Sequence, residues 1–358
     1  MICLHKKFNV RRFFCKICNV RKFLIKMILS IPYLCPQDKQ AVMIFVRRPQ
    51  TDPYFNLAAE EFLLKNSQED LLMLWQNESS VVVGKHQNVV AEVNLNFVQD
   101  NHIPVIRRIS GGGTVYHDRG NINLTVIQRA GNQKYPVDFK KFASPVITFL
   151  EQFGLEVDFK GKNNLLVNGK KISGNSAHVF KNRVLHHGTL LFNTNLDILE
   201  KAIHPRNNNI FDKSIKSIRA SVVNIADLLD KPVTKDEFLE NLGQFLKNYY
   251  SVTTENPLTE TEQQAIQKLA GEKYSSWNWN FGYSPKYTLR QEKDTEYGRF
   301  QVTMTVIEGR IASVELIFEG KKLEKTEQQL LGQKHDKNEL RYILANNRFS
   351  DIIIQTLF

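Results

Sequence analysis

Residues 107–121 read Arg-Arg-Ile-Ser-Gly-Gly-Gly-Thr-Val-Tyr-His-Asp-Arg-Gly-Asn, and they lie between two apolar runs, 104–107 and 122–127, that are typical of strands. Three successive glycines let the backbone come close to a ligand, so that its N–H groups can point at phosphate oxygens. The two arginines add fixed positive charge and planar donors. No Gly-Lys-Ser/Thr follows, so this run is not a P-loop. We therefore expect a glycine turn between strands that binds an anionic group.

The composition excludes several classes of protein. The chain has 358 residues, 42% hydrophobic and 24% charged, which is typical of a globular protein with two domains. No apolar run is long enough to suggest a membrane-spanning helix. The net charge of +11 is concentrated in residues 1–42, which hold nine Lys and Arg against one acid. Residues 43–358 have a surplus of only three positive charges, so we expect a partner that is neither nucleic acid nor membrane.

The first 42 residues also contain all four cysteines. The pair Cys15-Lys-Ile-Cys18 has metal-ligand spacing, but a second pair is missing, so we do not expect a zinc site. A compact pattern begins at Met43, and residues 1–42 are therefore expected to be a disordered basic extension or a misassigned start. The Arg-rich, acid-poor composition keeps a mitochondrial presequence open as the alternative.

The rest of the chain alternates helical and strand patterns. Asp52 before Pro53 is a helix-start signal, and Asn168-Gly169 is a strong hairpin signal. A polar stretch after residue 250 interrupts the pattern. We expect an α+β fold with a catalytic domain at 43–250, a linker at 251–258 and a small C-terminal domain at 259–358. The predicted strands are 71–75, 81–83, 104–107, 122–127, 190–192, 287–292, 300–307 and 311–318, and the predicted helices include 138–153, 197–203 and 235–250.

Two further clusters carry chemistry. Residues 161–174 read Gly-Lys-Asn-Asn-Leu-Leu-Val-Asn-Gly-Lys-Lys-Ile-Ser-Gly, and on a regular strand Lys170 and Lys171 point to opposite faces. One of them can therefore face a pocket while the other is solvated. His186 and His187 likewise face opposite ways, so they are poorly placed to share a metal ion. No zinc-binding motif of the His-Glu-x-x-His type occurs in residues 43–358.

These clusters together resemble the lipoate–protein ligase and lipoyltransferase family. The resemblance covers residues 43–358 in order, and the fold it implies is a large mixed-sheet domain of the biotinyl/lipoyl-ligase type followed by a small α+β accessory domain. The motifs that carry it are Asp-Pro-Tyr-Phe-Asn-Leu-Ala-Ala-Glu-Glu at 52–61, Leu-Trp-Gln-Asn at 74–77, Val-Gly-Lys-His-Gln-Asn at 83–88, the run 107–121, Lys-Ile-Ser-Gly at 171–174, Ser-Ile-Arg-Ala-Ser-Val-Val-Asn at 217–224 and Ser-Trp-Asn-Trp-Asn-Phe-Gly at 276–282.

The resemblance implies an ATP-dependent ligase that converts lipoate to lipoyl-AMP and passes the lipoyl group to one lysine of a carrier domain. By family position, Lys171 is the main electrostatic catalyst and bridges the lipoyl carboxyl group and the α-phosphate. ATP would be bound by Arg108, Gly111, Gly112, Gly113, Thr114, Val115, Tyr116 and Lys171. Lipoate would be bound by Trp75, Arg107, His117, Asn121, Lys171 and His187.

Two positions depart from the family pattern. Ile109 stands where the family often has a polar residue, and we expect it to add apolar surface to the lipoyl pocket. Asn164 stands where the family usually has Asp, close to where Mg²⁺ would neutralise the triphosphate. Asn164 therefore raises the question of whether the chain makes lipoyl-AMP itself.

Four other functions compete with the ATP-dependent ligase. A transferase that uses preformed lipoyl-AMP stays open, because it shares the same pocket. A cysteine-thioester transferase is excluded, because residues 43–358 contain no cysteine. A biotin–protein ligase is disfavoured because its Gly-Arg-Gly-Arg-x-Gly loop is missing. A non-catalytic binding module is disfavoured because Arg108 and Lys171 are both present.

The resemblance also implies partners and a compartment. The expected acceptors are lipoyl domains of 2-oxoacid dehydrogenase acyltransferase subunits and the glycine-cleavage carrier protein. We expect a monomer in the cytoplasm, with the mitochondrion as the alternative. Which carrier is modified, and whether lipoate is preferred to octanoate, stay open at this point.

Overall fold

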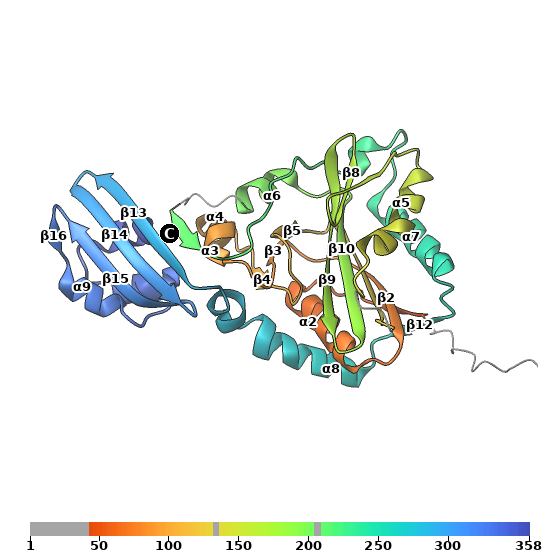
Figure 1. Ribbon diagram of the computed structural model, residues 1–358, viewed down its shortest axis with the longest axis horizontal. Coiled ribbons are helices and arrows are strands. Elements are labelled where there is room, and N and C mark those ends of the chain that lie inside the picture. The colour runs from red at the N-terminus through yellow and green to blue at the C-terminus, as the bar shows by residue number, and fades with distance from the viewer. Residues whose placement is uncertain (1–42, 132–135, 204–208) are drawn as a thin grey trace, which may run out of the picture. The chain divides into compact units, whose positions relative to one another are not determined.

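The computed structural model describes residues 43–131, 136–203 and 209–358 (Figure 1). The expectations for the basic extension and its cysteine pair lie outside the described residues. Within the described residues no helix is both long and apolar enough to cross a membrane.

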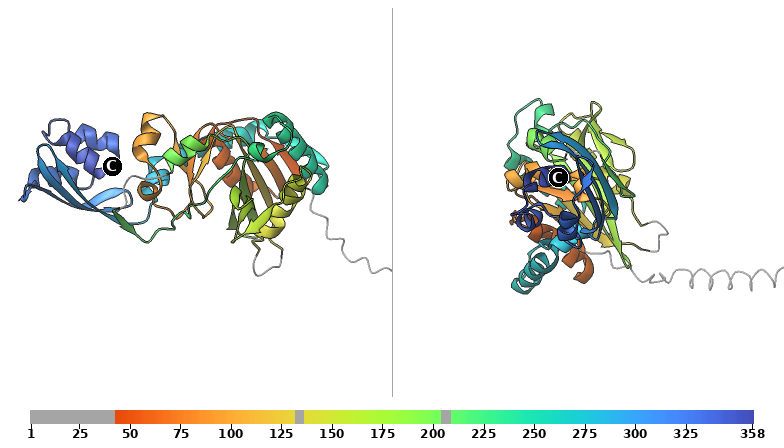
Figure 2. Two further views of the ribbon diagram at one scale, coloured as in Figure 1. Left: turned by 90° about the horizontal axis from the view of Figure 1, so that it is seen from above. Right: turned by 90° about the vertical axis from the view of Figure 1, so that its left-hand side faces the viewer.

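An eight-stranded mixed sheet forms the centre of the larger part of the chain, in the order β12-β1-β2-β6-β10-β9-β8-β7. Helices cover both of its faces (Figures 1 and 2). Leu72 and Leu74 face the helices α5 (Phe139–Glu151) and α7 (Lys235–Tyr249), whereas Trp75 faces α2 (Pro53–Asn66). The strands are β1 (Met43–Arg47), β2 (Asp70–Trp75), β6 (Asn121–Arg129), β7 (Asp158–Lys160), β8 (Asn164–Val167), β9 (Lys170–Phe180), β10 (Arg183–Leu191) and β12 (Thr254–Pro257).

The local signals in the sequence explain where several elements begin and turn. The Asp52 carboxylate accepts a hydrogen bond from Tyr54 N, and α2 starts at Pro53 as predicted. Asn168 and Gly169 both have positive φ, 51° and 76°, as a tight two-residue turn between β8 and β9 requires. The hairpin therefore places Lys170 and Lys171 at the start of β9.

A small sheet of three strands carries the glycine run. Its order is β4 (Val105–Arg107), β3 (Ser80–Val83) and β5 (Val115–His117), so residues 108–114 form the loop that joins β4 to β5. Buried and partly buried apolar side chains of α3 (Val89–Glu92), α4 (Leu95–Asp100) and α6 (Leu196–Ala202) pack against this sheet. The predicted glycine turn between strands is therefore confirmed.

The polar stretch predicted as a linker at 251–258 contains β12, which pairs in parallel with β1 at the edge of the large sheet. Its polar composition has a physical reason: most of its side chains are exposed, while its backbone pairs with β1. The chain then continues through α8 (Glu260–Leu269), which packs near α2. Three short helices complete this part, η1 (Ala226–Leu228), η2 (Ala270–Tyr274) and η3 (Asn278–Gly282), of which the last two are π-helical.

A five-stranded sheet, β11-β13-β14-β15-β16, forms the C-terminal part, and helices α9 to α11 contribute to its core. The three strands predicted from the sequence are β13, β14 and β15. The edge strand β11 comes from residues before α7, so the chain adds a strand to the small sheet from a distance in sequence. The bounds are β11 (Ile210–Asp212), β13 (Tyr287–Thr295), β14 (Gly298–Ile307), β15 (Arg310–Phe318), β16 (Lys321–Lys322), α9 (Glu324–Leu330), α10 (Lys337–Ile343) and α11 (Ser350–Leu357).

Candidate active site

Two adjacent cavities lie on the face of the large sheet that also carries Trp75. The first has a volume of about 430 Å³ and the second about 370 Å³. They share one wall, made by Thr114, Val115, Lys171, Gly174, Thr189, Lys216, Ser217 and Ile218. The first cavity continues toward Trp75, and the second continues toward Tyr116 and Arg219.

Lys171 stands in the wall between the two cavities. Its backbone N–H donates to Ser221 O, and its carbonyl accepts from Val223 N, which fixes the start of β9. Its side chain lies over Gly174, where a Cβ atom would meet Lys171 Nζ at 2.9 Å. Burial and the nearby charge of Arg108 lower the pKa of Lys171. Lys170 is exposed, so the expected division between the two lysines is confirmed.

The glycine loop is held by its carbonyl groups. Arg108 Nη2 donates to Gly111 O at 2.5 Å and to Gly113 O at 2.7 Å, and Ser176 Oγ donates to Gly111 O at 2.8 Å. Among the described residues none accepts a hydrogen bond from the N–H groups of Gly111, Gly112 or Gly113. The loop therefore keeps three backbone donors for an anion.

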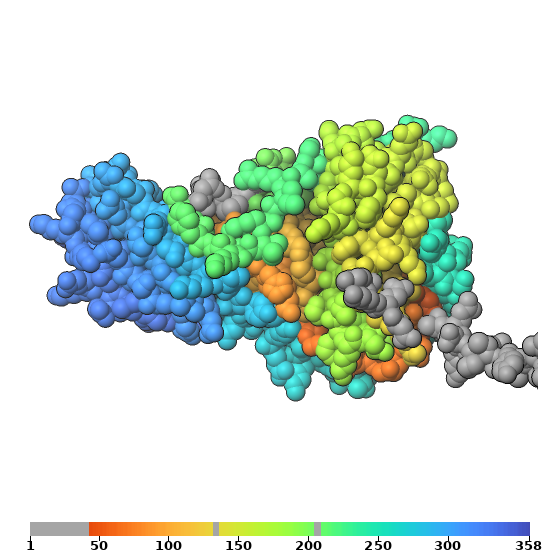
Figure 3. Space-filling model, in the orientation of Figure 1, coloured from red at the N-terminus to blue at the C-terminus, as the bar shows by residue number. Residues whose placement is uncertain are grey.

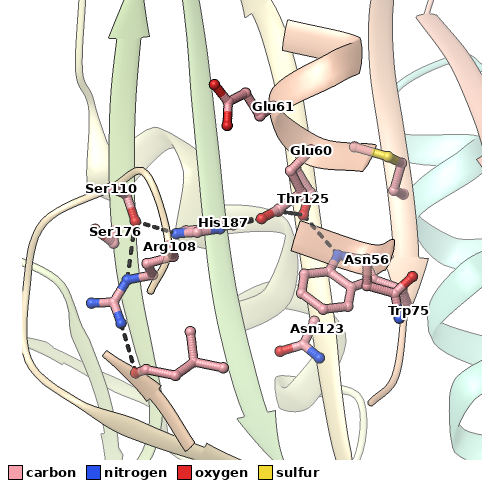
Figure 4. Close-up of polar contacts among 12 residues, drawn as sticks. Asn56, Glu60, Glu61, Trp75, Arg108, Ser110, Asn123, Thr125, Ser176 and His187 are labelled. Carbon is pink, nitrogen blue, oxygen red and sulfur yellow. Dashed lines mark hydrogen bonds and ion pairs between the residues drawn. The ribbon is translucent and has the colours of Figure 1, made fainter. Parts of the chain in front are cut away.

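A buried chain of hydrogen bonds runs beside the first cavity (Figure 4). His187 Nε2 lies 2.6 Å from Ser110 Oγ, and His187 Nδ1 lies 3.0 Å from Glu60 Oε2. Thr125 Oγ1 donates to Glu60 and accepts from Trp75 Nε1. Burial alone would raise the pKa of Glu60, but its contacts outweigh burial and hold that pKa below the ordinary value. This series of hydrogen bonds ends at Arg108, whose Nε donates to Ser110 Oγ. The series therefore supports the arginine that holds the glycine loop.

His117 and Asn123 each present a buried polar atom without a partner in the part of the chain that the structure describes. Both residues line the first cavity and are 3% and 1% exposed. The two atoms, His117 Nε2 and Asn123 Nδ2, make no hydrogen bond to any described residue. Buried polar groups are normally paired, so these two atoms indicate a place for a ligand or an ordered water.

The comparisons with known proteins agree with this geometry. Residues 52–247 match the model of the lipoyl protein ligase A/B catalytic domain, and residues 284–357 match the bacterial lipoate protein ligase C-terminus. The lipoate-protein ligase LplJ of Bacillus subtilis is 35% identical over 310 residues, 84% of this chain and 93% of that protein. The chain belongs to the lipoate–protein ligase family.

Other members of the lipoate–protein ligase family are also similar. Lipoate–protein ligase 1 of Staphylococcus aureus is 38% identical over 73% of this chain and 80% of that protein. A solved lipoate-protein ligase A bound with ATP superposes with a TM-score of 0.58, at 25% identity, over 68% of this chain and 99% of that one. A lipoate protein ligase of Thermoplasma acidophilum with bound lipoic acid gives a TM-score of 0.57 at 25% identity, with the same coverage. The resemblance inferred from the motifs is thus confirmed.

Most of the residues predicted for this ligase site come together in the two cavities. The first cavity is lined by Trp75, Arg108, Gly112, Gly113, Thr114, Val115, His117, Asn164, Lys171 and His187, and Tyr116 lines the second. Gly111 lies in the same loop, where Arg108 and Ser176 hold its carbonyl. Asn121 lines neither cavity: it is fully buried and donates through Nδ2 to Asn123 Oδ1.

Arg107 requires a correction. It was expected to line the lipoyl pocket, but its side chain is fully buried away from both cavities. The guanidinium donates to the carbonyls of Gly84, Lys85, Gln87, Trp279 and Asn280 and to Ser284 Oγ. The guanidinium therefore ties β4 both to the residues that follow β3 and to the segment around η3. Ile109 was also expected at the lipoyl pocket, but it packs in the core near α2 and does not line the first cavity.

Residues 209–224 form a strap that the sequence does not reveal as a unit. One end is β11 in the small sheet, and the other end pairs with Lys171 through Val222. Figure 3 shows this green segment between the blue small sheet and the yellow-green strands of the large sheet. In its middle, Ser217 Oγ accepts from Thr114 N at 2.9 Å and contacts Glu92. The strap thus closes the shared wall over the glycine loop.

Asn164 lines the first cavity near Lys171. Its Oδ1 and Lys171 Nζ both lie within 4 Å of the position that a Cβ atom on Gly174 would take. No cluster of three or more His, Cys, Asp or Glu that could hold a metal ion occurs among the described residues. An amide oxygen is an acceptable but uncharged Mg²⁺ ligand, and Mg²⁺ in nucleotide sites relies largely on substrate phosphates. The residues present therefore fit a metal ion that arrives with ATP.

Proposed function

We propose that this ligase joins lipoate to ATP in the two cavities, with Lys171 acting where they meet, and then transfers the lipoyl group to a carrier lysine. The observation that carries the proposal is the position of Lys171 Nζ in the wall that both cavities share. The first cavity has an aromatic and apolar side at Leu57, Trp75 and Val82, which suits the lipoyl chain. The second is lined by Thr114 at the end of the glycine loop and by Lys216 and Arg219, whose positive charges suit the nucleotide phosphates.

In the first half-reaction a lipoate carboxylate oxygen attacks the α-phosphorus of ATP, and pyrophosphate leaves. Two anionic groups must approach each other, so fixed positive charge and N–H donors lower the barrier most where negative charge gathers. Lys171 supplies the charge, and the N–H groups of Gly111, Gly112 and Gly113 supply donors. Arg108 holds the loop in place through two of its carbonyls.

In the second half-reaction the carrier amine attacks the lipoyl carbonyl carbon, and AMP leaves. Lys171 would again lie beside the oxygen that gains negative charge. The remaining rate acceleration comes mostly from binding the acyl-adenylate in a fixed orientation between the walls of the two cavities. The strap 209–224 forms that wall over the shared region of the two cavities.

Mg²⁺ would neutralise the triphosphate and the leaving pyrophosphate. Asn164 would hold it from the first cavity, and Glu92 is the acidic residue that lines the second. Because Asn164 is uncharged, we expect the phosphates to provide most of the affinity for the metal ion.

We propose that the acceptors are lipoyl domains of 2-oxoacid dehydrogenase acyltransferase subunits and the glycine-cleavage carrier protein. A bipartite lipoate protein ligase of T. acidophilum, similar in fold with a TM-score of 0.59 at 24% identity, belongs to a lipoylation system that includes an E2 lipoyl domain. We further propose a monomer in the cytoplasm, with a catalytic domain that begins at residue 43 and includes β12 and α8, and an accessory domain formed by the five-stranded sheet and helices α9 to α11. The curated bacterial relatives favour the cytoplasm over the mitochondrion.

A transferase that takes preformed lipoyl-AMP is the second candidate, and Asn164 is the observation that favours it. Pyrophosphate release separates the two functions. The full chain is incubated with ATP, Mg²⁺ and lipoate, first without and then with a lipoyl domain. The ligase gives a burst of pyrophosphate followed by turnover that depends on the carrier. Absence of pyrophosphate, combined with modification of the carrier from supplied lipoyl-AMP, would instead establish the transferase.

A further inference from the structure

The Trp75 end of the first cavity carries two hydrogen-bond donors without a partner among the described residues. His117 lies at the end of β5 with its ring centroid 6.1 Å from that of Trp75. Its Nε2 atom and Asn123 Nδ2 are both buried, and neither bonds to a group of residues 43–131, 136–203 or 209–358. Burying an unpaired donor is unfavourable, so a cavity wall that keeps two of them suits a ligand that accepts hydrogen bonds.

A buried relay fixes which nitrogen of His117 carries the proton. Arg48 Nη2 donates to Asn56 Oδ1, so Asn56 must present its Nδ2 on the other side, where Gln50 O and Gln76 O also accept. Asn56 Nδ2 donates to Asn77 Oδ1 at 2.9 Å, so the Asn77 atom 3.1 Å from His117 Nδ1 is the donor Nδ2. His117 Nδ1 must therefore accept, and the proton of the neutral ring sits on Nε2.

The imidazole stays neutral in this environment. Burial, together with the charge of Arg108, lowers the pKa of His117 to about 3. A single Nε2–H group is thus presented to the cavity at neutral pH. Asn123 adds its amide nitrogen, because its Oδ1 already accepts from Asn121.

Strand register sets how far these donors lie from Lys171. Trp75 pairs with Asn123, Asn123 with Thr189, and Thr189 with Gly174, over which the Lys171 side chain lies. These side chains share one face, and neighbouring strands are about 4.8 Å apart, so Asn123 is about 10 Å from Gly174. An acid whose carboxyl group lies at Lys171 and whose chain has the length of lipoate therefore ends beside Asn123 and His117.

We infer that the first cavity selects medium-chain acids that carry a hydrogen-bond acceptor near the end of the chain. The inference rests on the proposed function and specifies its substrate class. The dithiolane sulfurs of lipoate are weak acceptors that can meet the two donors. Octanoate ends in a methyl group, so it displaces water from the donors and leaves them unpaired. A keto acid of the same length carries a stronger acceptor than sulfur.

The direct test compares dissociation constants for lipoate, octanoate, 6-oxo-octanoate and 7-oxo-octanoate on the full chain by calorimetry. We expect octanoate to bind about tenfold more weakly than lipoate. At least one keto acid should also bind more tightly than octanoate, although it is more strongly hydrated in water. Octanoate that binds as tightly as both lipoate and the two keto acids would overturn the inference.

Two variants locate the effect. His117→Phe and Asn123→Leu should each bring the ratio of the octanoate and lipoate dissociation constants toward one. The matched control is His186→Phe on the other face of β10, where the ring stacks on Phe142, and it should keep the wild-type ratio. A general loss of structure would weaken both acids alike and leave the ratio unchanged. The wild-type comparison of four acids decides the matter even where a variant does not fold.

The tautomer can be read independently. In protein labelled with ¹⁵N-histidine, the His117 signal, assigned by its loss in His117→Phe, should show a protonated Nε2 and an unprotonated Nδ1 from pH 7 to pH 5. A protonated Nδ1 would contradict the relay. Failure of lipoate itself to bind would refute the proposed function, whereas binding without preference would refute only this inference.

Discussion

Arg107 and Arg108 are neighbours in the chain, yet they belong to two different regions. Arg107 is buried among carbonyls of residues 84–87 and 279–280 and joins the small sheet β4-β3-β5 to the segment that leads into the C-terminal part. Arg108 lines the first cavity and holds the glycine loop. An arginine thus stabilises the fold at position 107 and forms part of the binding site at position 108.

The same contrast recurs at the other paired residues. Lys171 faces the cavities while Lys170 faces solvent, and His187 contacts Glu60 while His186 packs on Phe142. Alternation along strands explains both pairs. The exposed Lys170 is therefore a matched control for Lys171.

The largest expected effect separates the two arginines. Arg107→Met should lower the free energy of unfolding by at least about 3 kcal/mol, because it leaves several buried carbonyls without a donor. At this chain size that loss corresponds to a fall in Tm of about 4 °C, measured by calorimetry. Arg108→Met should instead raise the KM for ATP more than Arg107→Met does. Equal effects of both variants on Tm and on KM would show that Arg107 and Arg108 do not have separate structural and binding roles.

A second prediction concerns the glycine under the catalytic lysine. In Gly174→Ala the new methyl group would meet Lys171 Nζ at 2.9 Å, and the flexible end of the lysine must move. A displacement of about 1 Å at a reacting group can cost about 100-fold in rate, so we expect a 10- to 100-fold loss in kcat with little change in Tm. Gly271→Ala is the control, because a Cβ atom there meets nothing within 4 Å. Unchanged kcat in Gly174→Ala would place Lys171 away from the reacting atoms.

A smaller effect is expected of pH on the free energy of unfolding. Burial lowers the pKa of His117 to about 3 and of His186 and His335 to about 4. The unfolded chain binds protons at these histidines below about pH 6.5 while the folded chain does not, so stability falls as the pH drops from 6.5 to 5. Each histidine contributes up to about 1.4 kcal/mol per pH unit to this slope. Urea unfolding should show the slope, and His335→Phe should reduce it by about one proton; a flat profile would contradict the buried neutral state.

Much of this architecture could be predicted from local signals. Asp52-Pro53 marks the start of α2, Asn168-Gly169 marks the hairpin, and the three glycines mark the loop. These signals depend on backbone geometry within a few residues. The edge strand β12 was missed because exposed strand residues are polar, and β11 because it pairs with a strand far away in sequence.

The site shows the same limit. Glu60, Ser110 and Thr125 were not predicted, because their roles depend on contacts between strands and helices that are distant in sequence. The sequence nevertheless carried a signal for Thr125 and for Asn123. In β6, Asn121, Asn123 and Thr125 alternate with the apolar residues of the core, so one face of that strand had to be polar and buried. Arg107 could not be distinguished from Arg108, because both arginines lie next to the glycine loop in sequence.

The role of Lys171 is tested by comparing Lys171→Ala with Lys170→Ala in pyrophosphate release at saturating ATP and lipoate. Lys171→Ala should lose at least about 100-fold in rate, because it removes the charge from the shared wall of the two cavities. Lys170→Ala should stay within about twofold of the wild type, as expected for an exposed surface position. Equal rates for the two variants would contradict the central claim that Lys171 joins the acid and nucleotide sites.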